Sequence, residues 1–241
     1  YGKYINSISE DEIKNYYGQS FWNKNMDVFF KNETRDSLNR ATGQFSLLKR
    51  YLLKKNIKIL EIGAGSAQLS KKLKEYNTNY ELEVVETGDN WTDYYKKNDL
   101  KRISYFYPDT NISKYDVIIA SHWLEHVLDL KNTIKELYEN LKRDGLLFIE
   151  VPNCNKEYWE HDIKDIPHIH FFTKRSLKSI FNDNGFKVNF IDNFGITNKE
   201  FYNLNYSSKG MSKELKEKID TSIRENLHRE NGNILRMVAK K

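Results

Sequence analysis

Histidine and glutamate side chains gather in two short segments of the chain. His122, Glu125 and His126 stand in one segment and His168 and His170 in the other, which together hold four of the six histidines. An imidazole or a carboxylate with a pKa near neutrality can accept the proton of an attacking hydroxyl group. We therefore take His126, His168, His170 and Glu125 as the candidate catalytic residues. The alternative for each residue, taken singly, is a structural role in fixing its loop.

A turn with two glycines lies far upstream of these segments. The short apolar run at residues 57–62 contains β-branched residues and leads into Gly63 and Gly65, as is typical of a strand covered on both faces of a parallel sheet. Leu69 and Leu73 then mark the apolar face of a helix. Glycines let the backbone approach a ligand closely, and free N–H groups at a helix start point toward it. This stretch therefore predicts a cradle for a small molecule.

Glu86 and Gln68 indicate which kind of molecule the cradle takes. Residues 80–86 predict a second strand that ends in Glu86, which follows Gly63 by 23 positions. In nucleotide-binding units, a carboxylate about 20 residues after the glycines accepts hydrogen bonds from ribose hydroxyls. A dinucleotide fingerprint needs a third glycine where this chain has Gln68. The pattern therefore argues against a nicotinamide dinucleotide and favours a nucleoside without phosphates.

Strand and helix signals alternate along the rest of the chain and define the elements that must position these residues. Further strands are predicted at residues 103–106, 115–120, 146–153, 186–190 and 233–239, and helices within 9–53 and at 130–141 and 173–184. We expect an α/β fold: a Rossmann-like, seven-stranded, mostly parallel sheet with helices on both faces, plus N-terminal helices. The predicted organisation is a helical cap at 1–53 packed on a core domain at 54–241, with a helical insertion at about 196–232.

Composition limits the partners and the compartment. The net charge of the 241 residues is only +5, and the charges are interspersed, so a nucleic-acid partner is not indicated. The chain lacks an apolar run near the roughly 20 residues that span a membrane. The single cysteine, Cys154, suits a reducing compartment, so we expect a cytoplasmic protein. Apolar residues repeat every four positions in a predicted helix at 211–229, which favours a packing seam over a lid or a homodimer contact.

Several motifs together resemble a known family. The sequence Glu61-Ile62-Gly63-Ala64-Gly65 resembles the first motif of class I S-adenosylmethionine-dependent methyltransferases. With the segments 121–127, 141–153 and 168–173, the chain resembles small-molecule and sugar-pathway methyltransferases and the ubiquinone-pathway O-methyltransferases. The resemblance covers roughly residues 45–195 and the last predicted strand. It departs from many members at Ala67, where they have a third glycine.

The resemblance implies S-adenosylmethionine as the cofactor and assigns residues to it. Glu61 would orient the methionine end, the glycine turn would pass close to the cofactor, and Glu86 would hold the ribose hydroxyls. Ser121 and His122 would lie beside the methionine moiety and the sulfonium. The predicted cofactor site comprises Glu61, Gly63, Ala64, Gly65, Gln68, Glu86, Ser121 and His122.

The predicted reaction is O-methylation of a small polar acceptor, such as a sugar, a nucleotide-sugar or a cell-surface polysaccharide precursor. A sugar or phenol hydroxyl needs a base, whereas a phosphate or carboxylate acceptor would need only cations such as Lys174 and Arg175. The alternatives are methylation of an RNA ribose 2′-oxygen, a cofactor-binding interaction module without catalysis, and a nicotinamide oxidoreductase.

A metal site is a further alternative. His122 and His126 are four residues apart and would share a helix face, and His168 or His170 could complete a set of nitrogen and oxygen ligands around Glu125. This resembles metal-dependent small-RNA 2′-O-methyltransferases and some quinone-pathway enzymes. Their pattern has a carboxylate where this chain has His122, so we predict no metal.

Overall fold

A seven-stranded sheet forms the centre of the structure, a computed structural model that describes residues 2–3, 9–15, 36–108, 114–161, 168–205, 226 and 228–241. The strand order is β4-β3-β2-β5-β6-β9-β8. The strands are β2 (Lys58–Ile62), β3 (Glu81–Val85), β4 (Lys101–Ser104), β5 (Tyr115–Ser121), β6 (Leu141–Pro152), β8 (Lys187–Thr197) and β9 (Gly232–Lys240). The first five are parallel to one another, while β9 is antiparallel to both β6 and β8. This confirms the predicted Rossmann-like, mostly parallel sheet.

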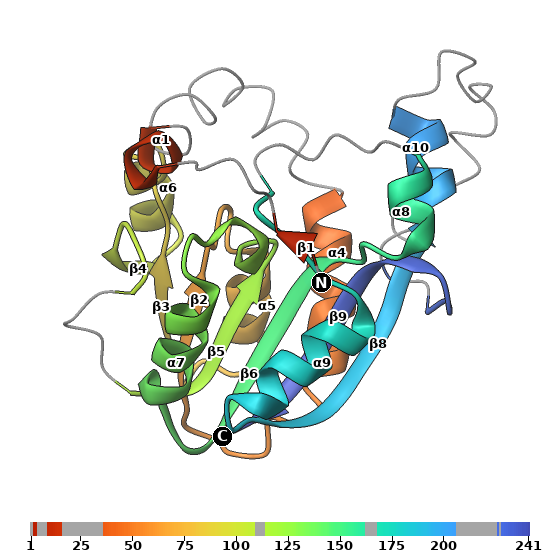
Figure 1. Cartoon of the computed structure of the whole chain (residues 1–241). Helices are drawn as coiled ribbons and strands as arrows, with labels where there is room; N and C mark the ends of the chain where they lie inside the picture. The colour runs from red at the N-terminus through yellow and green to blue at the C-terminus, as the bar shows by residue number, and fades with distance from the viewer. Residues whose placement is uncertain are drawn as a thin grey trace.

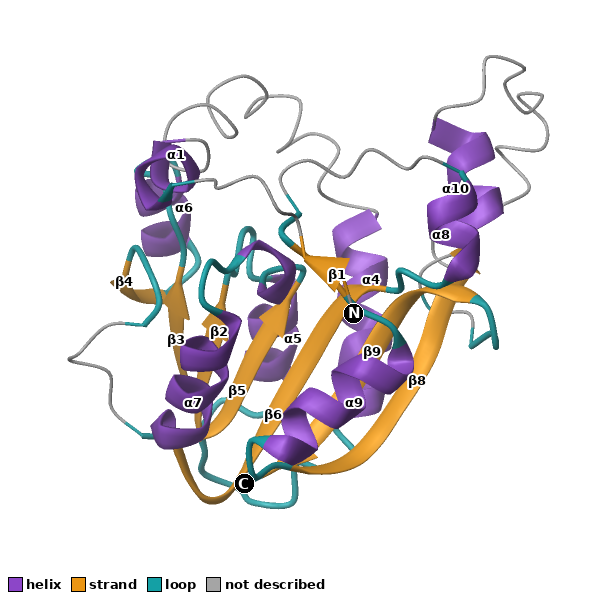
Figure 2. Ribbon diagram, in the orientation of Figure 1, coloured by secondary structure: helices purple, strands orange, loops and turns teal. Residues whose placement is uncertain are grey.

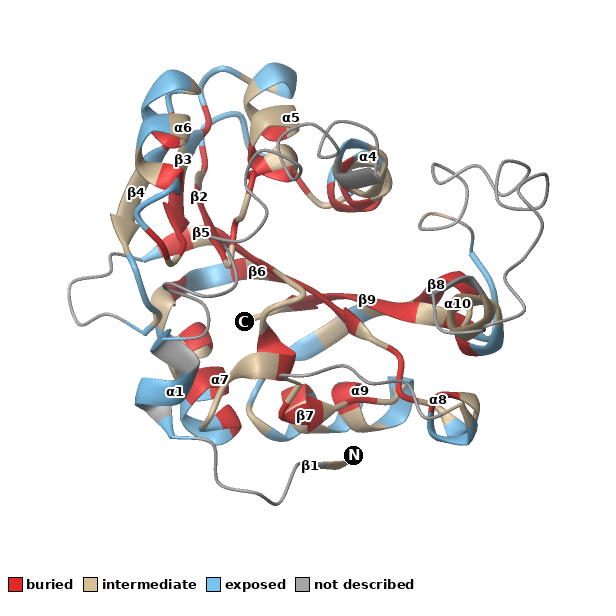
Figure 3. Ribbon diagram, turned by 90° about the horizontal axis from the view of Figure 1, so that it is seen from above, coloured by how far each residue is buried: buried red, intermediate tan, exposed pale blue. Residues whose placement is uncertain are grey.

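Helices cover both faces of this sheet, as predicted. In Figures 1 and 3, α4 (Asp36–Leu48) and α5 (Gln68–Tyr76) lie on one face, and α7 (Leu130–Asn140) and α9 (Lys174–Asp183) lie on the other. The short helices α8 (Lys156–Glu160) and α10 (Asn198–Asn205) contact each other near the carboxyl end of β6. The remaining described helices are α1 (Glu10–Asn15), α6 (Trp91–Lys97) and the 3₁₀ turn η2 (Leu124–His126).

Side-chain caps determine where α7 and α9 begin. The Thr173 side chain accepts a hydrogen bond from the Ser176 N–H, and the Ser176 side chain accepts one from the Thr173 N–H, which completes a capping box at α9. Asp129 caps α7 by accepting from Asn132 N–H. Each such cap is worth about 1 kcal/mol. The helix predicted at residues 173–184 is therefore confirmed, with Thr173 as its capping residue.

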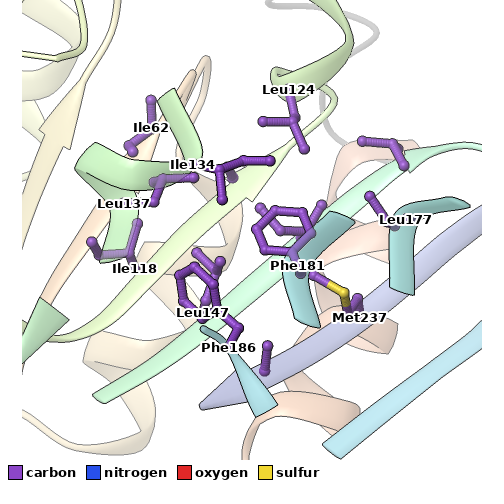
Figure 4. Packing of buried hydrophobic residues seen from close by; sticks show 14 of the residues in the cluster. Ile62, Ile118, Leu124, Ile134, Leu137, Leu147, Leu177, Phe181, Phe186 and Met237 are labelled. Atoms are coloured by element: carbon purple, nitrogen blue, oxygen red, sulfur yellow. The ribbon is translucent and has the colours of Figure 1, made fainter. Parts of the chain in front are cut away.

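Apolar side chains fill the space between the sheet and each helix layer. Figure 4 shows Leu177 and Phe181 of α9 close to Phe186 and Met237, and Leu137 of α7 in the same cluster next to Ile134 and Ile118. All of these side chains are buried. Burying a side chain of this size contributes roughly 1.5–3 kcal/mol, so this layer holds α7 and α9 against the strands that carry the site.

Some elements differ from the predicted ones. Strand β8 runs to Thr197, into the range expected to be a helical insertion, and within that insertion the residues 206–225 and 227 lie outside the described part. Most of the helix predicted at 211–229 and much of the N-terminal cap lie there too, so these remain predictions. A small antiparallel pair, β1 (Gly2–Lys3) with β7 (His170–Phe171), was not predicted. Within the described ranges, no helix is both long and apolar enough to cross a bilayer.

Gly232 offers a test of the antiparallel half of the sheet. A Cβ atom at this position would overlap the backbone carbonyl of Phe194 on the neighbouring strand β8. Because backbone cannot move aside as a flexible side chain can, Gly232→Ala should lower the free energy of unfolding by about 2 kcal/mol or more. Urea unfolding followed by circular dichroism measures this, with the adjacent exposed Asn231→Ala as the control. Equal stability of the two variants would contradict the close approach of β8 and β9.

Candidate functional site

The candidate site lies at the carboxyl ends of four parallel strands. Strands β2, β3, β5 and β6 are paired in parallel, so their ends meet at the upper edge of the sheet in Figure 2. Gly63 follows β2, Glu86 follows β3 and His122 follows β5. In open α/β sheets this edge is where ligands bind. The fold therefore brings the glycine turn, Glu86 and the first histidine segment to one side of the molecule.

The glycine turn and Glu86 form one half of this site. Gly63 and Gly65 have φ angles of 65° and 49°, which favour glycine. The carboxylate of Glu86 accepts a hydrogen bond of 2.7 Å from Gly65 N–H, and Thr87 N–H donates to its other oxygen at 2.9 Å. A Cβ atom at Gly65 would meet no atom of the described residues within 4 Å, whereas one at Gly63 would lie 3.0 Å from Trp123. Open space beside the Gly65 backbone, next to a buried carboxylate, fits a nucleoside whose ribose hydroxyls donate to Glu86.

Glu61 lies beneath this turn and links it to α5. Its carboxylate accepts hydrogen bonds from Ser70 Oγ at 2.5 Å and from Ser70 N–H at 3.2 Å. Burial raises the pKa of Glu61 to about 7, against the opposing effect of Ser70. Burial likewise raises the pKa of Glu86 to about 7, against the hydrogen bonds from Gly65 and Thr87. Without a ligand, both carboxyl groups therefore titrate near neutral pH.

Two other predicted cofactor residues complete the turn. Ala64 is buried, and Gln68, the first residue of α5, is half-buried with its Nε2 donating to Tyr94 Oη at 3.4 Å. Ala67, where the resembling family often has glycine, adopts a left-handed φ of 51°. This conformation explains why glycine is favoured there, since a Cβ atom adds strain in that region.

Ser121 and His122 end β5 on the other half of the site. Ser121 Oγ accepts from Gln44 Nε2 at 2.8 Å and lies 3.1 Å from Glu150 Oε1. The ring of His122 lies between two carboxylates, with Nδ1 3.3 Å from Glu125 and Nε2 3.3 Å from Glu150. Burial and the charge of Arg40 oppose protonation of His122, but the two carboxylates outweigh them and raise its pKa to about 9. His122 is therefore an imidazolium at neutral pH.

Glu125, His126 and His168 form a cluster beside His122. Each offers one ligand atom, and these atoms all lie within 4.8 Å of one another. Glu125 is fully buried, and its oxygens accept no well-aligned hydrogen bond from the described residues. Burial opposes its ionisation, but His122 and His126 outweigh this and lower its pKa to about 2. Burial lowers the pKa of His168, so that ring is neutral at neutral pH. The cluster can hold a proton or, by its ligand types, a metal ion.

His170 lies apart from this cluster. Its ring is buried, and its Nε2 is 2.7 Å from the carbonyl oxygen of Val127. It also belongs to the short strand β7, which pairs with β1. Among the candidate histidines, the structure thus brings together His126 and His168, whose ring centroids are 4.8 Å apart. Glu125, the residue before His126, joins this pair.

Sequence reasoning missed a group of four polar residues centred on Glu150, whose carboxylate lies beside Ser121 at the end of β5. Glu150 on β6 and Arg236 on β9 are fully buried and lie opposite each other in the sheet. Arg40 and Gln44 reach the same place from α4. The signal for the first two was a charged residue inside an otherwise apolar strand, which is rare unless the charge is paired. One helical turn separates Arg40 from Gln44, but this spacing alone carries no such signal.

Glu61 generates a prediction about the cofactor-free protein. Between its unfolded pKa and about 7, the native state holds a proton that the unfolded state loses, so stability falls as pH rises through this window. Glu61→Gln removes that loss and can still accept both Ser70 bonds. It should raise the free energy of unfolding at pH 8 by up to about 3 kcal/mol, with little effect at pH 4.5.

Urea unfolding at the two pH values measures this effect. Glu83→Gln is the matched control, because burial of Glu83 is outweighed by Lys101 and Tyr115, which lower its pKa. That control should lose stability at pH 8. A Glu61→Gln variant that is no more stable than the wild type at pH 8 would contradict the raised pKa.

Known proteins share sequence patterns and the fold with this chain. A family model described as a methyltransferase domain matches residues 32–189. The ubiquinone biosynthesis O-methyltransferase of Pelagibacter ubique is 24% identical over 239 residues, covering 85% of this chain and 98% of that protein. The malonyl-[acyl-carrier protein] O-methyltransferase of Bacillus anthracis is 25% identical over 107 residues, covering 42% and 40%.

Solved structures share the fold. A 1,6-didemethyltoxoflavin-N1-methyltransferase of Burkholderia thailandensis aligns with a TM-score of 0.63 at 12% identity, covering 99% of this chain and 92% of that one. An S-adenosylmethionine-dependent methyltransferase of Archaeoglobus fulgidus aligns with a TM-score of 0.57 at 22% identity, covering 82% and 92%. Because the family model spans more than half of the chain, the chain belongs to the methyltransferase domain family and is an S-adenosylmethionine-dependent methyltransferase.

Proposed function

We propose that this methyltransferase transfers the methyl group of S-adenosylmethionine to an oxygen of a small polar acceptor, such as a sugar, a nucleotide-sugar or a polysaccharide precursor. The observation that carries this is the cluster of Glu125, His126 and His168 at the same sheet edge as the glycine turn and Glu86. One half of the edge suits a nucleoside, and the other half holds a proton acceptor.

The donor is held by the first half of the edge. Glu86 accepts from the ribose hydroxyls, the backbone of Gly63, Ala64 and Gly65 passes close to the cofactor, and Glu61 fixes the turn through Ser70. Gln68 adds a polar side chain at the start of α5. When bound, the cofactor supplies a methyl group already activated on a sulfonium.

The methionine end of the donor is placed at Ser121 and His122. Its carboxylate needs a cation, and Arg40 supplies one from α4: its Nε is 3.8 Å from Glu150 Oε1, and its side chain is 34% exposed. The His122 imidazolium adds a second positive charge nearby. A guanidinium is well suited to a carboxylate because its donors form two parallel hydrogen bonds.

The acceptor is activated by the second half of the edge. With S-adenosylmethionine bound, His126 or His168 would take the proton of the attacking hydroxyl, and the cofactor would supply the methyl group that this oxygen receives and would leave as the thioether. Glu125 is ionised and stabilises the imidazolium that forms. Holding the two reactants in line supplies most of the remaining acceleration. We assign His170 a structural role, since its ring nitrogen already lies against Val127.

The relatives support an oxygen acceptor. The proteins of Pelagibacter ubique and Bacillus anthracis are both O-methyltransferases by name, the first in ubiquinone biosynthesis and the second acting on malonyl-[acyl-carrier protein]. Identities of 24% and 25% support the reaction class rather than either acceptor. The similarity to the enzyme of ubiquinone biosynthesis also supports a small acceptor for this chain.

Glu86→Ala tests the donor half. Loss of a charge-assisted acceptor for the ribose hydroxyls should weaken binding of S-adenosylhomocysteine by about 1–3 kcal/mol. Isothermal titration calorimetry at pH 8, where Glu86 is ionised, measures the change. Glu81→Ala, an exposed glutamate at the opposite end of β3, is the matched control. Unchanged affinity of Glu86→Ala would refute its ribose role.

His126→Ala tests the acceptor half. With radiolabelled S-adenosylmethionine and a panel of nucleotide-sugars, sugars and catechols, we expect transfer to at least one acceptor and a loss of about 100-fold or more in the variant. Affinity for S-adenosylhomocysteine should be unchanged. His228→Ala, a histidine paired with Asp192 on the surface, is the control. Normal turnover in His126→Ala moves the base to His168, and normal turnover in His168→Ala as well would reject this mechanism.

Two further outcomes of the same assay separate the alternatives. Activity that EDTA abolishes and a divalent cation restores would replace the metal-free base by a metal at Glu125, His126 and His168. Tight donor binding with no transfer to any acceptor would instead favour a binding module. Methylation of RNA alone, with binding that weakens steeply with salt, would favour the ribose 2′-oxygen.

A further inference from the structure

Glu150 and Arg236 form an ion pair inside the sheet, at the edge that carries the site. They lie directly opposite each other on the antiparallel strands β6 and β9. Arg236 Nε donates to Glu150 Oε2 at 2.5 Å, and the side chains are 1% and 0% exposed. Arg236 is itself held by Asn226 Oδ1 at 3.1 Å and lies over the ring of Phe194.

The other oxygen of Glu150 faces the site. Gln44 Nε2 donates to Glu150 Oε1 at 2.9 Å, and Ser121 Oγ lies 3.1 Å from the same oxygen. His122 Nε2 is 3.3 Å away, and Arg40 Nε is 3.8 Å away. One carboxylate oxygen thus gathers groups from the middle of α4 and from the end of β5, which are far apart in sequence.

This arrangement is a poor way to gain stability. Removing two charges from water costs about as much as their attraction returns, so a well-packed apolar pair would hold β6 and β9 together equally well. The carboxylate does, however, fix the position of every group around Oε1. The carboxylate lies at the end of β5, beside Ser121 and His122. These two residues belong to the candidate site, so fixing their positions can affect ligand binding.

We propose that Glu150, held by Arg236, is a positioning residue for the part of the cofactor site that receives the amino-acid moiety of S-adenosylmethionine. It acts through Arg40, Ser121 and His122, which it holds at the end of β5. This inference rests on the proposed function, which places the methionine end at Ser121 and His122. The adenosine moiety is held separately by the glycine turn and Glu86.

The division of the site allows a test with two ligands and no acceptor. S-adenosylhomocysteine carries both the adenosine and the amino-acid moieties, whereas 5′-methylthioadenosine lacks the amino-acid moiety. Replacing a group that positions only the amino-acid end should weaken binding of S-adenosylhomocysteine and leave binding of 5′-methylthioadenosine unchanged. A general loss of structure would weaken both.

Isothermal titration calorimetry of Glu150→Gln with both ligands is the experiment. We expect the dissociation constant of S-adenosylhomocysteine to rise about tenfold or more, and that of 5′-methylthioadenosine to stay within about twofold, for folded protein checked by circular dichroism. Glu83→Gln is the control: it removes another buried carboxylate, paired with Lys58 and Lys101 away from the strand ends. It should change neither dissociation constant.

Arg40→Met is the second variant, because a half-exposed side chain can be replaced without breaking the core. It should weaken S-adenosylhomocysteine alone, by about tenfold. If Glu150 acts through Arg40, the double variant should lose less than the product of the two single losses. Fully multiplicative losses would overturn this route and leave Glu150 without a positioning role for Arg40.

The proposal is overturned if Glu150→Gln weakens both ligands equally or neither, or if the wild type binds S-adenosylhomocysteine no more tightly than 5′-methylthioadenosine. Failure of the proposed function gives a different pattern: Glu86→Ala would then leave both ligands unaffected. Should the wild type bind neither ligand, both the proposed function and this inference are rejected.

Discussion

Parallel pairing of β2 with β3 and β5, and of β5 with β6, is the constraint on which the site depends. Because parallel strands end at the same edge, each one delivers the polar residue that follows its apolar run to a common place. The runs themselves are buried on both faces, under α4 and α5 on one side and α7 and α9 on the other. The packing that stabilises the sheet therefore also determines which polar groups meet.

Four buried carboxyl groups at this edge fall into two electrostatic classes. Glu61 and Glu86 receive hydrogen bonds from backbone and hydroxyl groups, which do not offset their burial, and their pKa values rise to about 7. Glu125 and Glu150 lie beside His122, and Glu150 also beside Arg236, so their pKa values are lowered despite burial. The first pair belongs to the glycine turn and the start of α5, where Ser70, Gly65 and Thr87 supply the hydrogen bonds. The second pair is already neutralised by the protein and holds its neighbours in fixed positions.

Much of the fold could be predicted from the sequence, and so could the meeting of Glu86 with the glycine turn. Strands at 57–62 and 115–120 were evident because both faces are buried and the runs are apolar, and Glu86 was found from its distance to Gly63. The ion pair of Glu150 with Arg236 could not be found this way. It depends on the register of β6 against the antiparallel β9, a contact between residues 86 positions apart that local patterns do not encode.

The histidine loop shows a second limit. His168 and His170 are two residues apart, and sequence alone treated them alike. In the structure, one joins Glu125 and His126, and the other enters the short strand β7 with its ring against Val127. The difference arises from the backbone path of an irregular segment, which composition and spacing do not determine. About half of the N-terminal cap and more than half of the predicted insertion lie outside the described residues, so both remain predictions.

The position of β9 between β6 and β8 affects the order in which the sheet can form during folding. Synthesis delivers β9 after every strand that it contacts, so until it inserts, Glu150 lacks its arginine partner and β6 has an open edge. An unpaired carboxylate in that position would take up a proton or draw in water, and Arg40, Gln44 and His122 would lose their common anchor. The strands that carry the glycine turn and Glu86 have their sheet partners before β9 is made, whereas the arrangement around Glu150 is complete only after β9 has docked.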